Sequence, residues 1–323
     1  MSTIHWVVAG IGDIARKRVI PAIFAEPRSK LYGLVTRDPA KAEPWPDVKT
    51  WPTVEAAVQD PAVDAVYIAL PVSMHAPTAI AALRAGKHVL CEKPMALSDA
   101  ESQRMVVEAE ASGRVFGVAY YRRLYPKLIR AKKLIAEGVI GQPVLAEANC
   151  HSWLPAAERS WLLDPAMAGG GPLYDTACHR IDAMNFLFGR PERVAAMLSN
   201  AVHPLRVEDS ATITLGYAGG IHGIVDVRWN SRIYRDQLRI VGTEGELDLH
   251  TLNDPELGIN DHSLNGYVEM LPPHANFHYP LVLNFVGAIV SNPPTAVVCP
   301  AEQARWTDWV IEQAVAQSAA SAR

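Results

Sequence analysis

Cysteine is scarce in this chain of 323 residues, which has four cysteines and no C-x-x-C pair. The four lie too far apart to indicate a zinc ribbon or a secreted disulfide framework, so a reducing cytoplasm fits best. A block of like charge is also absent, and the formal net charge is -4. This even mixture of charges gives little basis for binding nucleic acid or an anionic membrane, whereas small molecules remain possible partners.

Long apolar runs are missing too, since nothing in the sequence approaches the ~18 apolar residues of a membrane span. The first residues have no basic stretch or cleavage signal and lead directly into a strand pattern, so we expect a soluble, unprocessed protein. With 49% hydrophobic residues the chain can fill two cores, and two domains are the default for this length.

The first part of the chain alternates short β-rich runs with helical patterns. Strands are predicted at residues 4–9, 31–36, 65–69, 88–91 and 115–119, and helices at 11–24, 53–58, 75–85 and 98–112. Repetition of strand and helix implies parallel strands that are covered on both faces. The sequence therefore predicts a doubly wound α/β domain.

The pattern changes near Tyr120, where we place the domain boundary. A helix at 128–136 is followed by strands without intervening helices, at 144–150, 193–201, 211–217, 221–229 and 237–241. Glycine-containing turns at 218–220 and 242–245 join consecutive strands as hairpins, which predicts an antiparallel sheet. Further helices are predicted at 181–188, 281–290 and 301–319, the last with Trp306, Val310 and Ala314 on one face.

A glycine motif follows the first predicted strand and opens a helix. Gly10 permits a tight turn, Gly12 lets backbone amides approach a pyrophosphate, and Ala15 allows the helix to pack closely on the sheet. The start of a helix favours the negative charge of a phosphate. We therefore expect a dinucleotide here, although an ordinary turn between strand and helix has the same pattern. The predicted contacts are Gly10, Gly12, Asp13, Ile14 and Ala15.

An arginine stands at the end of the second predicted strand, in the run Thr36-Arg37-Asp38. Proteins specific for NAD usually have an acidic residue there to hold the ribose hydroxyls, whereas a guanidinium suits a 2′-phosphate. The sequence therefore favours NADP over NAD and adds Thr36 and Arg37 to the cofactor contacts. Asp38 could cap a helix or take the ribose role itself.

A lysine follows the fourth predicted strand, in the run Cys91-Glu92-Lys93-Pro94. Open parallel sheets bind ligands at the carboxyl ends of their strands, so we expect Lys93 to point into a crevice, although a solvated surface lysine is the plainer alternative. Pro71 and His75 follow the preceding strand at the same edge, and His75 could equally pack locally at a helix start. The further predicted cofactor contacts are Pro71, His75, Glu92 and Lys93.

Three glycines at 169–171 precede a helical segment that carries Asp175, His179 and Asp182. Asp175 and His179 are one turn apart and share a face, where a carboxylate can orient an imidazole or stabilise its charge. A capping aspartate and a buried histidine explain the same residues equally well. Histidine and aspartate at this spacing could ligate a metal, but no further ligands stand nearby, so we predict no metal site.

Together these motifs resemble the Gfo/Idh/MocA family of nicotinamide-dependent oxidoreductases over nearly the whole chain. The resemblance rests on the glycine motif, residues 85–94, residues 123–126 with 137–141, and the glycine loop before Asp175 and His179, all in the family's order. It implies an N-terminal Rossmann domain at residues 1–120. It also implies an α+β domain at 121–323 with an open, mostly antiparallel sheet and a C-terminal helix able to pack back on the first domain.

The resemblance also assigns roles to residues. The family's catalytic lysine falls on Lys93, and its Asp-x-x-x-His pair falls on Asp175 and His179. Many members oxidise a secondary hydroxyl of a sugar or cyclitol, or reduce the corresponding ketone, and a homodimer or homotetramer is implied. Ala177 replaces the usual glycine within the pair, which a helix tolerates, and Ser73 replaces the usual asparagine before His75.

Oxidation of a secondary alcohol removes a hydride from carbon and a proton from oxygen. His179 suits the base, Lys93 can donate to the hydroxyl oxygen, and Asp175 can orient His179 and bind a neighbouring hydroxyl. Lys93, Asp175 and His179 would thus contact substrate. The other substrate contacts expected from aromatic, imidazole and guanidinium chemistry are Tyr120, Arg123, His151 and Trp161, for each of which packing between domains is the alternative.

Two other functions are compatible with the resemblance. Some relatives use tightly held NAD to cleave glycosidic bonds through transient oxidation. Others bind a dinucleotide or a sugar without catalysis and regulate a partner. The presence of Lys93, Asp175 and His179 argues against the non-catalytic alternative.

Overall fold

The structure is a computed structural model that describes residues 3–154, 157–263, 265–292 and 295–321. The chain divides into unit 1, made of Met1–Tyr121 and His274–Arg305, and unit 2, made of Arg122–Pro273 and Trp306–Arg323. Residues 274–305 thus group with the first part of the chain, whereas the sequence pattern had left all of 121–323 together. This grouping could not be predicted, because no local pattern in the sequence marks a late segment that packs with the first part of the chain.

Unit 1 is built on a six-stranded parallel sheet in the order β3-β2-β1-β4-β5-β6. The strands are β1 (Ile4–Ala9), β2 (Ser29–Val35), β3 (Lys49–Trp51), β4 (Ala65–Ile68), β5 (His88–Cys91) and β6 (Phe116–Val118). β4 is buried along its whole length, and β1 and β5 nearly so, as expected for strands that are covered on both faces. Sequence analysis missed only β3 here, a short and largely exposed edge strand.

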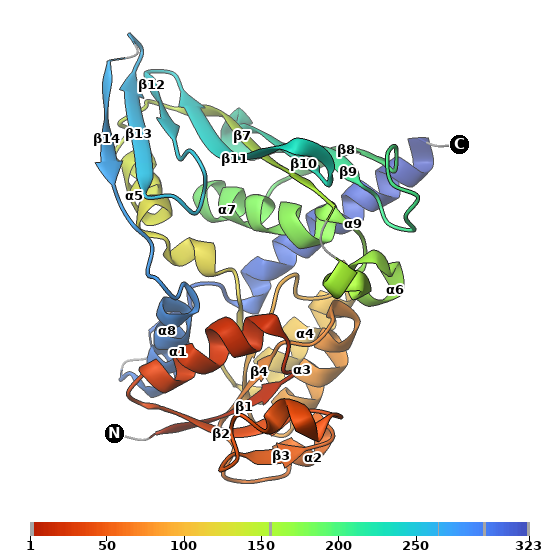
Figure 1. The fold of residues 1–323 in the computed structure, drawn as a ribbon. Coiled ribbons are helices and arrows are strands. Elements are labelled where there is room, and N and C mark those ends of the chain that lie inside the picture. The colour runs from red at the N-terminus through yellow and green to blue at the C-terminus, as the bar shows by residue number, and fades with distance from the viewer. Residues whose placement is uncertain (1–2, 155–156, 264, 293–294, 322–323) are drawn as a thin grey trace. The chain divides into compact units, whose positions relative to one another are not determined.

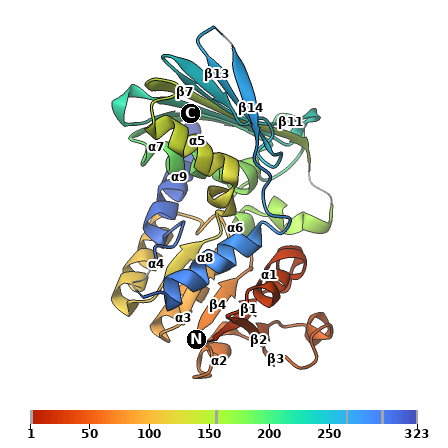
Figure 2. The same cartoon turned by 90° about the vertical axis from the view of Figure 1, so that its left-hand side faces the viewer.

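Helices cover both faces of this sheet (Figure 2). The π-helical turn η1 (Ala15–Val19), α1 (Ile20–Ala25) and α8 (His278–Val290) lie on one face, and α3 (His75–Arg84) and α4 (Asp99–Ser112) lie on the other. Local caps fix where helices begin: the hydroxyl of Ser98 accepts from the N–H of Glu101 before α4, and Thr53 does the same for Ala56 in α2 (Val54–Val58). Unit 1 is therefore the predicted doubly wound Rossmann fold.

Unit 2 contains an eight-stranded sheet in the order β14-β13-β12-β11-β7-β10-β9-β8. The strands are β7 (Pro143–Trp153), β8 (Arg193–Ser199), β9 (Ser210–Gly216), β10 (His222–Arg228), β11 (Asn230–Gly242), β12 (Gly245–Asp248), β13 (Glu256–Asp261) and β14 (Gly266–Met270). All neighbours are antiparallel except β7 and β10, which pair in parallel. The sheet is therefore mostly antiparallel, as predicted, with three additional strands in the β12–β14 segment.

One face of this sheet carries α5 (Pro126–Ala136), α7 (Cys178–Phe188) and the unit 2 part of α9 (Ala301–Ser321) (Figure 1). Along β10, Val225 and Val227 are buried while Asp226 and Arg228 are partly exposed, so the two faces differ in polarity. No helix in the described part of the chain lies on the other face in Figure 1, which we call the open face. Within the same residues, no helix is both long enough and apolar enough to cross a membrane.

Candidate active site

The glycine motif forms an open cradle at the carboxyl end of β1. Gly10 has a φ of 92°, and a Cβ at this position would lie 2.5 Å from the carbonyl oxygen of Ala69, so only glycine fits without strain. A Cβ on Gly12 would meet nothing within 4 Å, and the helix that contains η1 begins directly after it. Open space in front of a helix start is a suitable place for a dinucleotide phosphate.

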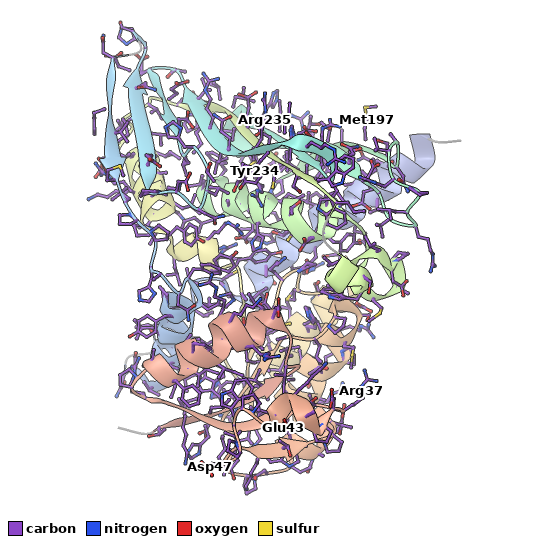
Figure 3. All side chains as sticks on the ribbon, viewed as in Figure 1. Arg37, Glu43, Asp47, Met197, Tyr234 and Arg235 are labelled. Carbon is purple, nitrogen blue, oxygen red and sulfur yellow. The ribbon has the colours of Figure 1, made fainter. Side chains whose placement is uncertain are left out.

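The end of β2 separates the roles of Arg37 and Asp38. The carboxylate of Asp38 accepts from the N–H of Ala40 at 3.2 Å and caps a short 3₁₀ helix, which is the first of the two roles predicted for it. Thr36 is tied to Asp38 through its hydroxyl, which accepts from the Asp38 N–H at 3.1 Å. Arg37 is exposed at the surface of unit 1, where Figure 3 labels it. Its guanidinium is therefore accessible to a charged ligand.

His75 joins the two loops that follow β4 and β5. Its side chain is 1% exposed, with Nδ1 lying 3.0 Å from the carbonyl oxygen of Pro94 and Nε2 lying 2.9 Å from that of Leu70. Burial lowers the pKa of His75, although both carbonyls act in the opposite direction. The residue starts α3 and packs locally, and Pro71 stands just before the short turn that leads into it.

The turn after β5 places Glu92 and Lys93 in different surroundings. Glu92 is buried, while Lys93 is half-buried and is followed by a cis bond to Pro94. The N–H of Glu92 donates to the carbonyl of Ile68 at 2.9 Å, which continues the pairing of β5 with β4. Lys93 thus leaves the sheet at its carboxyl edge, the same edge at which the Gly10 loop follows β1.

In unit 2, the three glycines form a compact loop between α6 (Pro165–Ala168) and the helix that carries Asp175 and His179. A Cβ on Gly171 would lie 2.0 Å from the carbonyl oxygen of Glu208, so the chain passes too closely for any larger residue. The helix starts with a π-helical turn at Leu173–Ala177, which contains Asp175, and continues as α7, which contains His179. Asp175 is half-buried and His179 is 6% exposed.

Two buried ion pairs fix α7 within unit 2. Arg123 donates through Nε and one terminal nitrogen to both oxygens of Asp182, at distances of 2.7 to 3.1 Å, and both side chains are at most 1% exposed. Arg180 pairs with Asp236 of β11, and both of these side chains are also buried. Arg180 and Asp182 follow His179 within three residues of the same helix, so these pairs fix the orientation of the segment that carries it.

The remaining predicted substrate residues lie in three different environments. Tyr120 belongs to unit 1 and is fully buried. His151 lies on the open face of the unit 2 sheet, where Nε2 is 2.6 Å from a carboxylate oxygen of Asp226. Trp161 packs against an apolar cluster that contains Leu162 and Trp229. The structure therefore does not bring His151 to the helix-covered face on which α7 lies.

Tyr234 and Glu208 belong to the surroundings of the α7 helix but were not identified from the sequence. Tyr234 is 63% exposed, and partial burial and the nearby charge of Asp236 raise its pKa. Glu208 accepts from the N–H of Leu173, at the start of the π-helical turn, at 3.0 Å, and burial raises its pKa. Neither residue stands in a local motif, so no sequence signal marked them.

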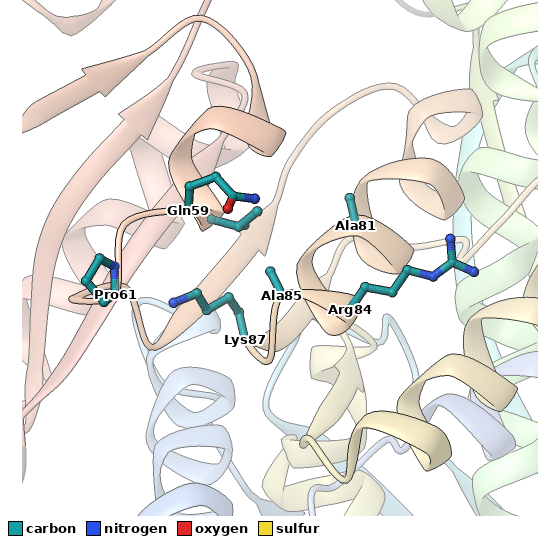
Figure 4. A pocket seen from close by; sticks show the side chains of 7 residues that line it. Gln59, Pro61, Ala81, Arg84, Ala85 and Lys87 are labelled. Carbon is teal, nitrogen blue, oxygen red and sulfur yellow. The ribbon is translucent and has the colours of Figure 1, made fainter.

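A surface pocket in unit 1 lies away from the Gly10 loop and Lys93 of the same unit (Figure 4). It is lined by residues including Gln59, Pro61, Arg84 and Lys87, which precede β4 or β5. It therefore lies at the amino ends of the strands, opposite to the edge that carries Gly10 and Lys93. In the residues that the structure describes, no group of three or more His, Cys, Asp or Glu side chains could hold a metal ion.

Comparison with known proteins identifies both parts of the chain. Residues 4–120 match the oxidoreductase family with an NAD-binding Rossmann fold, and residues 128–248 match the GFO/IDH/MocA C-terminal domain. The chain belongs to the GFO/IDH/MocA oxidoreductase family. It is accordingly an NAD(P)-dependent oxidoreductase, and the open cradle at Gly12 with the accessible guanidinium of Arg37 fits such a cofactor.

The relatives of the chain include proteins named as sugar reductases and dehydrogenases. The chain is 33% identical over 248 residues to the 1,5-anhydro-D-fructose reductase of Ensifer adhaerens, covering 75% of this chain and 74% of the relative. It is 31% identical over 245 residues to an NADP-dependent D-xylose 1-dehydrogenase of Haloferax volcanii, covering 75% and 74%. A levoglucosan dehydrogenase complex with NADH and levoglucosan has the same fold, with a TM-score of 0.90, 24% identity, and 99% and 98% coverage.

The Arg123–Asp182 pair predicts a stability loss that depends on pH. Arg123→Met leaves the Asp182 carboxylate buried without its guanidinium, which should lower the free energy of unfolding by about 3 kcal/mol at pH 8. Burial already raises the pKa of Asp182, and loss of Arg123 raises it further. The folded variant then binds a proton at a pH where the unfolded chain does not, so the deficit should shrink as the pH falls from 8 to 5.

Urea unfolding at both pH values measures this difference. Adding Asp182→Asn to Arg123→Met removes the buried charge and should recover part of the loss. Lys17→Met, which breaks an exposed ion pair with Asp13 at 2.8 Å, is the control and should leave the midpoint unchanged. An equal deficit at pH 5 and pH 8 would show that the charge of Asp182 is not the cause.

Proposed function

We propose that this protein interconverts a secondary alcohol and a ketone of a sugar, cyclitol or similar polyol, with NADP preferred over NAD. The main support is the position of the Gly10 cradle and Lys93 at one edge of one parallel sheet, after the neighbouring strands β1 and β5 on either side of β4. The relatives that act on anhydrofructose and xylose support a sugar-like substrate.

The proposed roles follow from the chemistry of each side chain. The nicotinamide supplies the hydride acceptor or donor when the cofactor is bound. Gly10, Gly12 and the helix start after them hold its phosphates, and Arg37 holds a 2′-phosphate. Lys93 donates a hydrogen bond to the reacting oxygen, His179 takes the proton from that oxygen, and Asp175 orients His179. Arg123 supports this group indirectly, because its guanidinium is bound to Asp182.

Self-association in the cytoplasm is a further part of the proposal, as a homodimer or homotetramer. The open face carries Met197, which is 80% exposed on β8 (Figure 3), beside partly exposed polar side chains such as Asp226. An exposed apolar residue on an uncovered sheet supports contact with a second copy. Met197→Glu should lower the mass measured by light scattering, and Met74→Glu, a change at an exposed methionine of unit 1, is the control. An unchanged mass in both variants would argue against this face.

Removal of the Lys93 amine tests the proposed chemistry. Lys93→Ala should lower kcat by at least about 100-fold, because the reacting oxygen loses its hydrogen-bond donor. The affinity for the dinucleotide, measured by fluorescence of its reduced form, should stay within about threefold, since the cradle is unchanged. Lys41→Ala, at an exposed lysine of the same unit, is the control. Normal turnover by Lys93→Ala in a screen of polyols and carbonyl compounds would refute the assigned role.

Arg37 predicts the cofactor preference. Arg37→Ala should weaken binding of NADPH about tenfold or more and leave binding of NADH unchanged, because only the 2′-phosphate needs the guanidinium. The two dissociation constants, compared with those of Lys41→Ala, measure this effect. Strong activity of the unaltered protein with NAD and none with NADP would contradict the preference.

A further inference from the structure

Glu92, the residue before Lys93, directs its carboxylate into the interior of unit 1. The residue is 8% exposed. One carboxylate oxygen, Oε1, accepts from the hydroxyl of Tyr67 on β4 at 2.7 Å, and the other, Oε2, accepts from the backbone N–H of Lys93 at 3.2 Å. A buried carboxylate is stable only when hydrogen bonds replace its hydration. This carboxylate is therefore tied to the backbone of the residue that follows it.

A histidine from a distant part of the chain supplies a further contact to this carboxylate. His278, in the first turn of α8, is 0% exposed, and its Nε2 lies 3.3 Å from Oε1 of Glu92. An ionised carboxylate can only accept a hydrogen bond, so Nε2 of His278 must carry a hydrogen and donate it to Glu92. The start of α8 is itself fixed, since the ring of Phe277 stacks on Tyr121 with centroids 4.5 Å apart and lies under the guanidinium of Arg18.

The other side of the turn is held by His75. As described above, the Nδ1 of this buried residue lies 3.0 Å from the carbonyl oxygen of Pro94, the residue after Lys93. Buried imidazoles from α3 and α8 thus contact the two residues that flank Lys93. Lys93 itself is half-buried, so the backbone is held on both sides while the side chain emerges.

The charge of Glu92 is maintained in spite of its burial. Burial alone would raise the pKa of Glu92, but the hydrogen bond from His278, the charge of Lys93 and the hydrogen bond from Tyr67 hold this pKa below its ordinary value. The titratable groups that face it are Tyr67 on β4, His75 on α3, Lys93, Tyr121 and His278 on α8. Glu92 is therefore an ionised group whose field acts on Lys93.

We propose that His278 is a positioning residue for Lys93. His278 holds the Glu92 carboxylate against Tyr67. The carboxylate in turn fixes the Lys93 backbone and keeps a negative charge near the Lys93 amine. The proposal deepens the function proposed above and rests on the catalytic role of Lys93. It assigns to Glu92 an interior role in place of the direct cofactor contact expected from its position in the sequence. His278 contacts neither substrate nor cofactor in this account.

The test measures the reactivity of Lys93 without any substrate. The purified protein is treated with acetic anhydride over a range of pH, and acetylation of Lys93 is followed by mass spectrometry of its peptide. His278→Leu removes the donor to Glu92, so the carboxylate is no longer held in place and its attraction for the positive charge of Lys93 weakens. The pH at which Lys93 becomes half-reactive should then fall by about one unit. His278→Gln, whose amide can donate in place of Nε2, should keep the half-reactive pH of Lys93 close to that of the unaltered protein.

Glu92→Gln tests the same point, because glutamine has nearly the shape of glutamate but lacks its negative charge. This variant replaces His278→Leu should the latter not fold. It should shift Lys93 in the same direction, while Lys41 in the same samples should not shift. With a substrate in hand, kcat should fall about tenfold or more in His278→Leu with KM within about threefold, and His278→Gln should recover it. Unchanged Lys93 reactivity in both His278→Leu and Glu92→Gln would overturn the proposal. Full activity of Lys93→Ala would instead refute the proposed function, whatever the labelling shows.

Discussion

Parallel pairing of β1, β4 and β5 is the constraint on which unit 1 depends. Parallel strands end at a common edge, so the chain leaves the sheet at that edge after each of these three neighbouring strands. Each departure exposes backbone groups that need partners, and the ring nitrogens of His75 contact carbonyls in two of the three loops. The Gly10 loop approaches Ala69 so closely that a side chain is excluded. The geometry that closes the fold therefore also creates the cradle and positions the lysine.

Buried charge fixes, in both units, the segments that carry the side chains proposed to react. In unit 1 the Glu92 carboxylate is held by Tyr67 and His278, and in unit 2 Asp182 is held by Arg123. Such groups contribute little net stability, because desolvation offsets most of the attraction. Their value lies in specificity, since each allows only one placement of its segment. The segments that carry Lys93 and His179 are thus each held by a buried carboxylate in their own unit.

Sequence reasoning succeeded where the signal was local. The apolar runs at 4–9 and 88–91 predicted β1 and β5 to the residue, and the helical pattern at 98–112 predicted α4 to within one residue. Contacts that join distant segments could not be predicted in this way. Glu92 and His278 are 186 residues apart, so nothing near Glu92 indicated an interior role. Likewise, His151 was predicted as a substrate contact from its residue type, whereas its place on the open face beside Asp226 follows from strand pairing.

The central claim is that a hydride passes between a carbinol carbon of the substrate and the dinucleotide. A sugar, polyol or glycoside that the protein converts in the presence of NADP can be prepared with deuterium on that carbon, and both products can be analysed by mass spectrometry. The account predicts one deuterium in the reduced dinucleotide and none at the new carbonyl carbon. Deuterium that stays entirely in the carbohydrate product, with a glycosidic bond cleaved and no reduced dinucleotide formed, would contradict it.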